Sequence, residues 1–117
     1  MHARVLVVDD DEAARAVVAQ LLRADGCDVE VASDGRQALE RLQQGAVPEI
    51  LLVDLMMPDV TGWALLDALA AMPDLAKLPV VVMTSFDEVV GLPPGCPVLH
   101  KPVDADVLLE RVHAALA

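Results

Sequence analysis

Aromatic side chains are almost missing from this sequence of 117 residues, which has one tryptophan, one phenylalanine and no tyrosine. Basic residues are also few: eight lysines and arginines stand against 19 acids, and the formal net charge is −11. Nucleic acid and anionic membranes repel such a charge. We therefore expect no direct contact with DNA, RNA or a membrane, and the positions of the acids become the informative part of the sequence.

Cysteines and long apolar runs are scarce as well. Cys27 and Cys96 show no C-x-x-C spacing and no clustered histidines accompany them, so neither a zinc site nor a disulfide framework is indicated. No apolar run approaches the roughly 18 residues that span a bilayer, and no signal-peptide pattern precedes the first strand. We expect a single domain over residues 1–117 in a cytoplasmic protein.

Five short, valine-rich runs alternate with helical patterns. The runs, at residues 5–8, 29–32, 50–53, 80–83 and 98–99, are mostly continuous in apolar character, as in strands that helices cover on both faces. Apolar residues at helical spacing, with polar caps, predict helices over 13–24, about 34–45, about 61–72 and 104–116. Strict alternation of strand and helix indicates right-handed β-α-β units and a parallel sheet.

One stretch departs from this alternation. Between the fourth and fifth runs, residues 85–97 read SFDEVVGLPPGCP, and their two glycines and three prolines leave room for one helical turn at most. We therefore predict an α/β fold with a doubly wound, five-stranded parallel sheet in the flavodoxin-like order 2-1-3-4-5. The fourth helix of that fold should be short or missing.

Acids follow the two strands that flank the switch point of this topology. Ligands of such sheets bind outside the carboxyl ends of the strands, between strands one and three. Asp9 and Asp10 follow the first strand, and Asp54 follows the third. Three carboxylates in one crevice repel one another unless a cation lies among them. Mg²⁺ suits the place because it prefers oxygen ligands and keeps positions open for water or phosphate.

Two more residues end strands at the same edge: Thr84 on the fourth and Lys101, one of only two lysines, on the fifth. A metal ion, a hydroxyl and an ammonium together offset the charge of a phosphoryl group. Asp54 is the candidate nucleophile, because a carboxylate can carry phosphate as an acyl phosphate. Asp11 and Glu12 are better explained by the start of the first helix, which Asp11 can cap.

The segments VVDDDEAAR, LLVDLMMPDVTG, VVMTS and HKP resemble, in order and over essentially the whole chain, the receiver domain of two-component response regulators. The third-strand segment is the most specific: Asp54, Met57, Pro58 and Gly62 match the family's D-x-x-M-P-x-x-x-G pattern. The resemblance implies that Asp54 accepts a phosphoryl group from a histidine kinase or phosphotransfer protein and relays the signal by a conformational change. It implies no enzyme beyond the domain's own phosphotransfer and dephosphorylation.

The resemblance also implies a metal site. Asp10 would bind Mg²⁺ directly and Asp9 through water, and Asp54 and the backbone carbonyl of Met56 would complete the protein's share. On the other flank, Thr84 would turn toward the phosphoryl oxygens.

Lys101 would form an ion pair with the same phosphoryl oxygens. The resemblance also implies that Pro102 follows this lysine through a cis peptide bond. Departures from the family lie nearby. Val98 stands three positions before the lysine, where most receivers carry an aromatic residue that changes rotamer on activation, and Val103 replaces the typical phenylalanine. The segment between Thr84 and Lys101 is also short. Because this face commonly carries output, we expect an atypical partner surface, with the effector unidentified.

Two positions flank the phosphoryl group in receivers and tune its hydrolysis: those two residues beyond the acceptor and two beyond the threonine. Here they are Met56 and Phe86, both bulky and apolar. We expect them to hinder an in-line water, so that self-dephosphorylation is slow and the phosphorylated form outlasts seconds.

Two other functions stay open. A phosphatase of the haloacid dehalogenase type also forms an aspartyl phosphate, and Asp9 and Asp11 offer its D-x-D pattern, although the chain length and the placement of Asp54 argue against it. Alternatively, an atypical receiver acts as a phosphorylation-independent interaction module. The missing helix and Val98 favour that reading, and the intact set of acids opposes it.

Overall fold

Five parallel strands form one sheet in the computed structural model, which describes residues 2–45 and 47–117. The strands run in the order β2-β1-β3-β4-β5, and all four neighbouring pairs are parallel. Their bounds are β1 Arg4–Val8, β2 Asp28–Ala32, β3 Ile50–Asp54, β4 Val80–Thr84 and β5 Val98–His100. The predicted doubly wound sheet is confirmed, with each strand within one residue of its apolar run.

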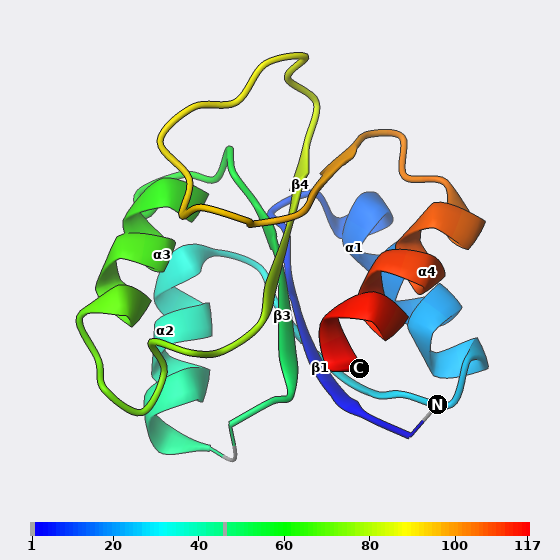
Figure 1. Ribbon diagram of the computed structural model, residues 1–117, viewed down its shortest axis with the longest axis horizontal. Helices are drawn as coiled ribbons and strands as arrows, with labels where there is room; N and C mark the ends of the chain where they lie inside the picture. Colours follow the sequence, from blue (N-terminus) through cyan, green and yellow to red (C-terminus); the bar gives the residue numbers. More distant parts are fainter. Residues whose placement is uncertain (1, 46) are drawn as a thin grey trace.

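Helices cover both faces of the sheet (Figure 1). One layer contains α1 (Glu12–Ala24) and α4 (Ala105–Leu116), and the other contains α2 (Gly35–Gln44) and α3 (Gly62–Ala70). None of the described helices is long and apolar enough to cross a bilayer.

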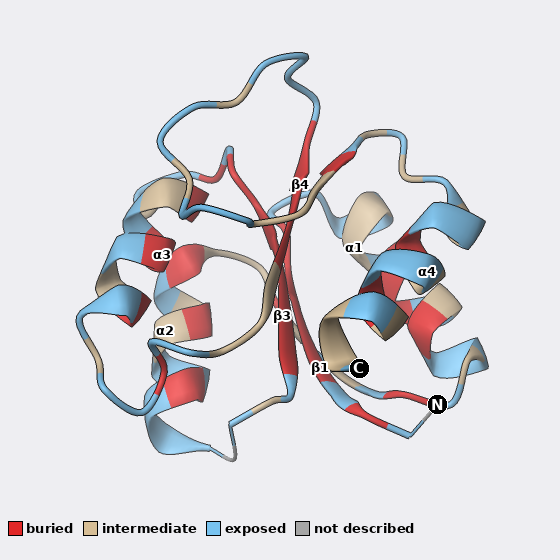
Figure 2. Ribbon diagram, viewed as in Figure 1, coloured by how far each residue is buried: buried red, intermediate tan, exposed pale blue. Residues whose placement is uncertain are grey.

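Each helical layer encloses its own apolar core. Along β1, Leu6 and Val8 belong to the core beneath α2 and α3, whereas Val5 and Val7 belong to the core beneath α1 and α4. Successive side chains of a strand point to opposite faces, so a strand covered on both sides must be apolar at every position. This explains the continuous valine-rich runs, and Figure 2 shows the central strands buried between the two layers.

Polar residues cap the four helices at the expected places. The side chains of Asp11, Asp34, Thr61 and Asp104 each accept hydrogen bonds from backbone N–H groups in the first turn of their helix. These bonds satisfy donors that have no partner within the helix. The predicted cap at Asp11 is confirmed, and the loop ends of β1 and β3 are thereby held at the edge where the acids lie.

The connection between β4 and β5 contains no helix, and the structure describes all of residues 85–97. The fourth helix of the fold is therefore missing, as predicted. Gly91 and Gly95 take positive φ angles of 82° and 77°, which side chains disfavour. The loop passes over the first turn of α3 (Figure 1) and is largely exposed (Figure 2).

Candidate functional site

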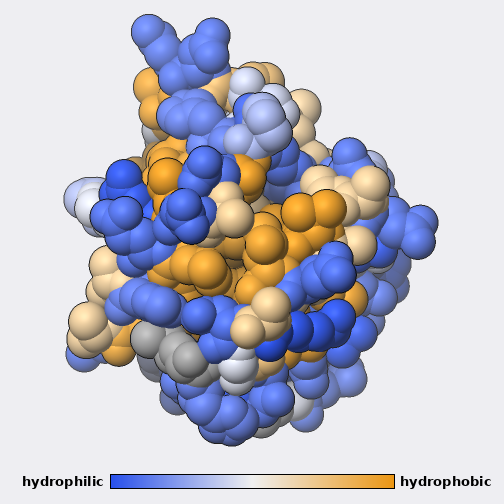
Figure 3. Space-filling view, turned by 90° about the vertical axis from the view of Figure 1, so that its right-hand side faces the viewer, coloured by the Kyte–Doolittle hydropathy of each residue, from blue (hydrophilic) through white to orange (hydrophobic). Residues whose placement is uncertain are grey.

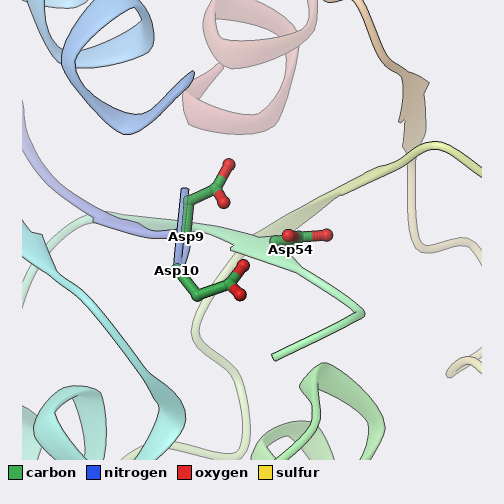
Figure 4. Close-up of side chains that lie close together, drawn as sticks. All are labelled: Asp9, Asp10 and Asp54. Carbon is green, nitrogen blue, oxygen red and sulfur yellow. The ribbon is translucent and has the colours of Figure 1, made fainter. Parts of the chain in front are cut away.

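Three carboxylates meet where β1 and β3 end. Asp9 and Asp10 follow β1 directly, and Asp54 ends β3, whose Val53 pairs with Val8. One oxygen from each carboxylate lies within 4.8 Å of the others, and Figure 4 shows the three side chains around one space. Asp9 and Asp54 are buried, whereas Asp10 is exposed. The cluster thus opens to solvent on the side of Asp10.

Lys101 reaches this cluster from the end of β5. Its Nζ donates hydrogen bonds to Oδ2 of Asp9 at 2.7 Å and to Oδ2 of Asp54 at 3.2 Å. Burial alone lowers the pKa of Lys101, but the hydrogen bonds and charges of the two carboxylates outweigh it and raise that pKa above its usual value. The ammonium stays positive at neutral pH. The bond from Lys101 to Pro102 is cis, as predicted.

For Asp54, burial outweighs the effect of the neighbouring positive charge on the pKa. Burial raises its pKa and the charge of Asp9 adds to the rise, while Lys101 and the backbone N–H of Met56 oppose it. That N–H donates to Oδ1 of Asp54 at 3.3 Å. The carboxylate of Asp54 is thus short of positive charge, and a bound cation would favour its ionised form.

Glycine at position 62 lets α3 begin against the end of β3. A Cβ at Gly62 would lie 2.7 Å from the carbonyl oxygen of Asp54 and 2.7 Å from Cα of Leu55. The Gly62 N–H donates to the carbonyl of Leu55 at 2.9 Å. The backbone of Asp54 is therefore in direct contact with the first turn of α3, which no larger residue permits without a shift.

Thr84 ends β4, one strand away from Asp54, and is only 1% exposed. Its hydroxyl oxygen accepts a hydrogen bond from the N–H of Phe86 at 3.1 Å. Its carbonyl accepts one from the N–H of Lys101 at 2.7 Å, which ties the ends of β4 and β5 together. The structure therefore places Thr84 at the same edge of the sheet as the acids, buried and with its hydroxyl already engaged.

Asp11 lies outside the cluster and serves α1. Its Oδ1 accepts hydrogen bonds from the N–H groups of Ala13 and Ala14 at 3.0 and 3.2 Å. The D-x-D pair that a dehalogenase-type phosphatase needs is therefore not assembled, because Asp10, and not Asp11, joins Asp9. Arg15 adds a contact that the sequence pattern does not signal: its Nη1 donates to the carbonyl of Asp9 at 2.9 Å.

Comparison with known protein families agrees with this geometry. The family model described as the response regulator receiver domain matches residues 5–113. The chain belongs to this family. The receiver fold places each segment of the resemblance noted in the sequence on the edge of the sheet where the acids meet.

Relatives of this receiver are response regulators. Response regulator MprA of Mycolicibacterium vanbaalenii is 37% identical over 121 residues, covering 99% of this chain and 51% of its own. Transcriptional regulatory protein CpxR of Escherichia coli is 36% identical over 118 residues, covering 97% of this chain and 49% of its own. The receiver thus spans about half the length of these curated relatives.

Solved structures with the same fold align with this chain over nearly the whole length of both chains. A putative response regulator from Chloroflexus aurantiacus superposes with a TM-score of 0.91 at 26% identity, covering 99% of this chain and 98% of its own. Chemotaxis response regulator CheY4 of Vibrio cholerae gives 0.87 at 28% identity, covering 99% and 100%.

This receiver holds its helix-free loop with aromatic contacts. The indole Nε1 of Trp63 donates to the carbonyl of Val90 at 2.8 Å. The rings of Trp63 and Phe86 are stacked, with centroids 6.4 Å apart and planes inclined by 26°. The bulky residues expected to shield a phosphoryl group, Met56 and Phe86, are 54% and 40% exposed. Val98 packs against the core beneath α2 and α3.

An apolar groove adjoins the acids on the side of α1. It has a volume of about 510 Å³ and is lined by Ala14, Val17 and Leu21 of α1 and by Val103, with Asp9 and Lys101 among its other lining residues. Figure 3, which faces the side of α1 and α4, shows apolar surface bordered by hydrophilic residues. The groove runs from solvent to the charged cluster.

Proposed function

We propose that this receiver accepts a phosphoryl group on Asp54 from a histidine kinase or a phosphotransfer protein, in a Mg²⁺-dependent reaction, and relays the signal by a conformational change. The convergence of Asp54 with Asp9, Asp10 and Lys101 is the observation that supports it. A carboxylate oxygen of Asp54 forms the new P–O bond, and the phosphohistidine P–N bond breaks, leaving the imidazole with the electron pair. The domain is no enzyme toward other substrates.

The donor set fits Mg²⁺, which prefers carboxylate oxygens and keeps several waters. Three carboxylates lie within reach of one ion, and the exposed Asp10 leaves room for water. Asp10 would bind directly, Asp9 through water, and Asp54 and the carbonyl of Met56 would complete the set. When bound, the ion supplies positive charge that offsets the repulsion between Asp54 and the incoming phosphate.

Lys101 and Thr84 complete the site on its two flanks. The ammonium of Lys101, held at 2.7 Å by Asp9, is 3.2 Å from Asp54 and pairs with a phosphoryl oxygen there. The hydroxyl of Thr84 turns and donates to a second oxygen. Both groups interact more strongly with the added phosphoryl group than with the free carboxylate, so phosphorylation changes their preferred positions.

The phosphodonor protein docks in the apolar groove of α1. The groove is continuous with the acceptor site through Asp9 and Lys101, and Val17 leaves 55% of its surface exposed there. A protein surface that buries Val17 brings its phosphohistidine close to Asp9 and Lys101, at the edge of the acceptor site.

Labelling with acetyl phosphate, or with a kinase, tests the acceptor. Wild type should take up label in Mg²⁺ and lose this ability in EDTA, whereas Asp54→Asn should take up none. Asp59→Asn is the matched control: Asp59 is an exposed carboxylate five residues away with φ of 66°, a conformation that asparagine tolerates. Label that persists in Asp54→Asn contradicts the proposal, and label on Asp9 would favour the phosphatase.

The missing helix also supports a second candidate, an interaction module that works without phosphorylation. Amide hydrogen exchange separates the two. A signalling receiver changes its exchange pattern when Mg²⁺ and beryllofluoride, a phosphoryl mimic, are added, whereas a constitutive module keeps the same pattern throughout.

A further inference from the structure

We propose that Trp63 couples the acceptor site to the loop 85–97 and thereby takes the place of the switch aromatic that this chain lacks at Val98. The inference rests on the proposed phosphorylation of Asp54. It goes further by naming the route through which the loop responds: Thr84, Phe86, Trp63 and the backbone of Val90.

The first contact of this route is a hydrogen bond to the hydroxyl of Thr84, which is expected to turn on phosphorylation. Oγ1 of Thr84 accepts the N–H of Phe86 at 3.1 Å, in a turn of two residues. When the hydroxyl rotates to donate to a phosphoryl oxygen, Oγ1 leaves the position at which Phe86 donates. Phosphorylation therefore removes the acceptor that fixes the start of the loop.

The second contact joins two aromatic rings. Phe86 and Trp63 are the only aromatic residues of the chain, and they stack with centroids 6.4 Å apart. Phe86 is 40% exposed, so few other neighbours hold it in place. A shift of the backbone at Phe86 therefore changes the ring contact with Trp63 and the surroundings of the indole.

The third contact holds the middle of the loop. Trp63 Nε1 donates to the carbonyl of Val90 at 2.8 Å, although the Val90 residue is 82% exposed. Gly91, at φ 82°, brings the chain against the indole: a Cβ there would lie 3.6 Å from Cδ1 of Trp63. The middle of the loop, which has no helix of its own, is thus in contact with the Trp63 side chain.

The other end of the route is anchored at the acceptor. Trp63 follows Gly62, whose Cα hydrogens face the carbonyl of Asp54 with no room for a Cβ. The backbone that precedes Trp63 is therefore anchored beside the acceptor, whereas the indole can lose its partners on the loop side. On phosphorylation, we expect Phe86 to separate from Trp63, the indole to gain exposure to water, and residues 86–92 to loosen.

Beryllofluoride with Mg²⁺ tests this route in the intact chain. Fluorine NMR reports binding, and Trp63, as the sole tryptophan, reports the response without a label. In wild type, bound beryllofluoride should shift the Trp63 emission to longer wavelength and increase its quenching by iodide. Amide exchange at Phe86, whose N–H donates to Oγ1 of Thr84, should accelerate about tenfold, as expected for the loss of roughly one hydrogen bond's protection.

Three variants assign the response to the contacts. Thr84→Val keeps the shape of the side chain and removes the hydroxyl, so it should bind beryllofluoride more weakly and, at saturating beryllofluoride, should show no shift of the Trp63 emission. Trp63→Phe keeps a ring and removes Nε1–H, the donor to Val90, so the loop should loosen and the Phe86 amide should exchange faster than in wild type before any addition. Val107→Ala, on the exposed side of α4, is the matched control and should respond as wild type does.

Each result decides the proposal. If Thr84→Val binds beryllofluoride and its Trp63 emission shifts as much as that of wild type, the route is wrong. If Thr84→Val no longer binds beryllofluoride, the variant Phe86→Leu tests the route instead. It keeps the hydroxyl of Thr84, so it should bind beryllofluoride while its Trp63 emission stays unchanged. If wild type binds beryllofluoride but its Trp63 emission does not change, the coupling is wrong and the proposed function is unaffected. If wild type neither binds beryllofluoride nor takes up label on Asp54, the proposed function and the coupling are both wrong.

Discussion

The carboxyl edge of the sheet has two sides: a charged, largely buried side at Asp9 and Lys101, and a partly exposed side at Phe86 and Trp63, whose contact is apolar. Asp9 and Lys101 form the charged side, where the Asp9 side chain has 0% exposure and the Lys101 side chain 19%. Phe86, Trp63 and the loop 85–97 form the apolar side, where the hydrogen bonds from Phe86 to Thr84 and from Trp63 to Val90 and the stacking of the two rings are among the contacts. Buried charges tolerate little change because each needs its partner. The apolar side has no such constraint, so a helix can be lost there while the acids stay intact.

The substitution Lys101→Met breaks the charged side and has the largest expected effect. It leaves Asp9 buried without its cation, and removal of one partner of such a pair costs about 3 kcal/mol or more of unfolding free energy. Urea denaturation without metal measures this loss. Mg²⁺ should then stabilise the variant more than wild type, because it supplies positive charge to the carboxylates that Lys101 no longer neutralises.

Lys77→Met is the control for that experiment, because Lys77 is the other lysine of the chain and is exposed. Its unfolding free energy should change by less than about 0.5 kcal/mol. Equal losses in the two variants would show that the charged side carries no special constraint.

Gly62→Ala acts where the two sides meet. The new Cβ would press on the backbone of Asp54 and Leu55 at 2.7 Å, and such overpacking costs about 1–3 kcal/mol. Labelling of Asp54 should slow, because its backbone must shift. In Gly45→Ala the nearest contact is 3.1 Å, to the carbonyl of Arg41, and both effects should be smaller; a normal labelling rate in Gly62→Ala would contradict the proposed contact.

Removing the bulky residues of the apolar side should speed hydrolysis. The double variant Met56→Ala, Phe86→Ala opens the approach of water to phosphorylated Asp54, and we expect loss of label about tenfold faster, which equals about 1.4 kcal/mol of barrier. Val90→Ala serves as control, since its exposed side chain lies on the same loop. An unchanged half-life, or a wild-type half-life of seconds, would show that these side chains do not shield the phosphoryl group.

The smallest effect lies far from both sides, at the contact between α4 and the end of α1. His113 Nε2 lies 2.7 Å from Oδ2 of Asp25, and this hydrogen bond lowers the pKa of Asp25 below its ordinary 3.8. A lowered carboxyl pKa stabilises the fold above the unfolded pKa, and the stabilisation is lost as the pH falls through the folded pKa. Wild type should therefore melt at a higher temperature than His113→Ala at about pH 5, with the gap closing as the pH falls below 3.8 and through the lowered pKa of Asp25.

Labelling of Asp54 should not differ between wild type and His113→Ala. A gap in melting temperature that widens toward acid pH would contradict the assigned sign for Asp25. A change in labelling would show that the α1–α4 contact reaches the acceptor, and the two sides could no longer be treated apart from this layer.

The strand order and the meeting of Asp9, Asp10 and Asp54 follow from pattern alone, because strand ends in a parallel sheet share one edge. The cap at Asp11 follows from its place before an apolar helix. The contact of Trp63 with Val90 could not be predicted in this way. A single tryptophan on a short helix has no periodicity, and the path of the loop depends on the positive φ of Gly91.

Arg15 shows the same limit. Its bond to the carbonyl of Asp9 joins a side chain to a main-chain atom, and main-chain acceptors are present at every residue, so sequence cannot single one out. The residue roles that depend on charge and on strand ends were therefore open to prediction, whereas contacts made to the backbone of a loop were not.

The hold of Trp63 on Val90 has a consequence for how such a domain can change over time. The indole donates its hydrogen bond to the main-chain carbonyl of Val90, a group that every amino acid has, and the valine side chain is exposed to solvent. Residue 90 can therefore be replaced without loosening the loop. Partner choice and signal transmission are separated at this position: new side chains can be tried for recognition while the main chain that would carry the signal stays the same.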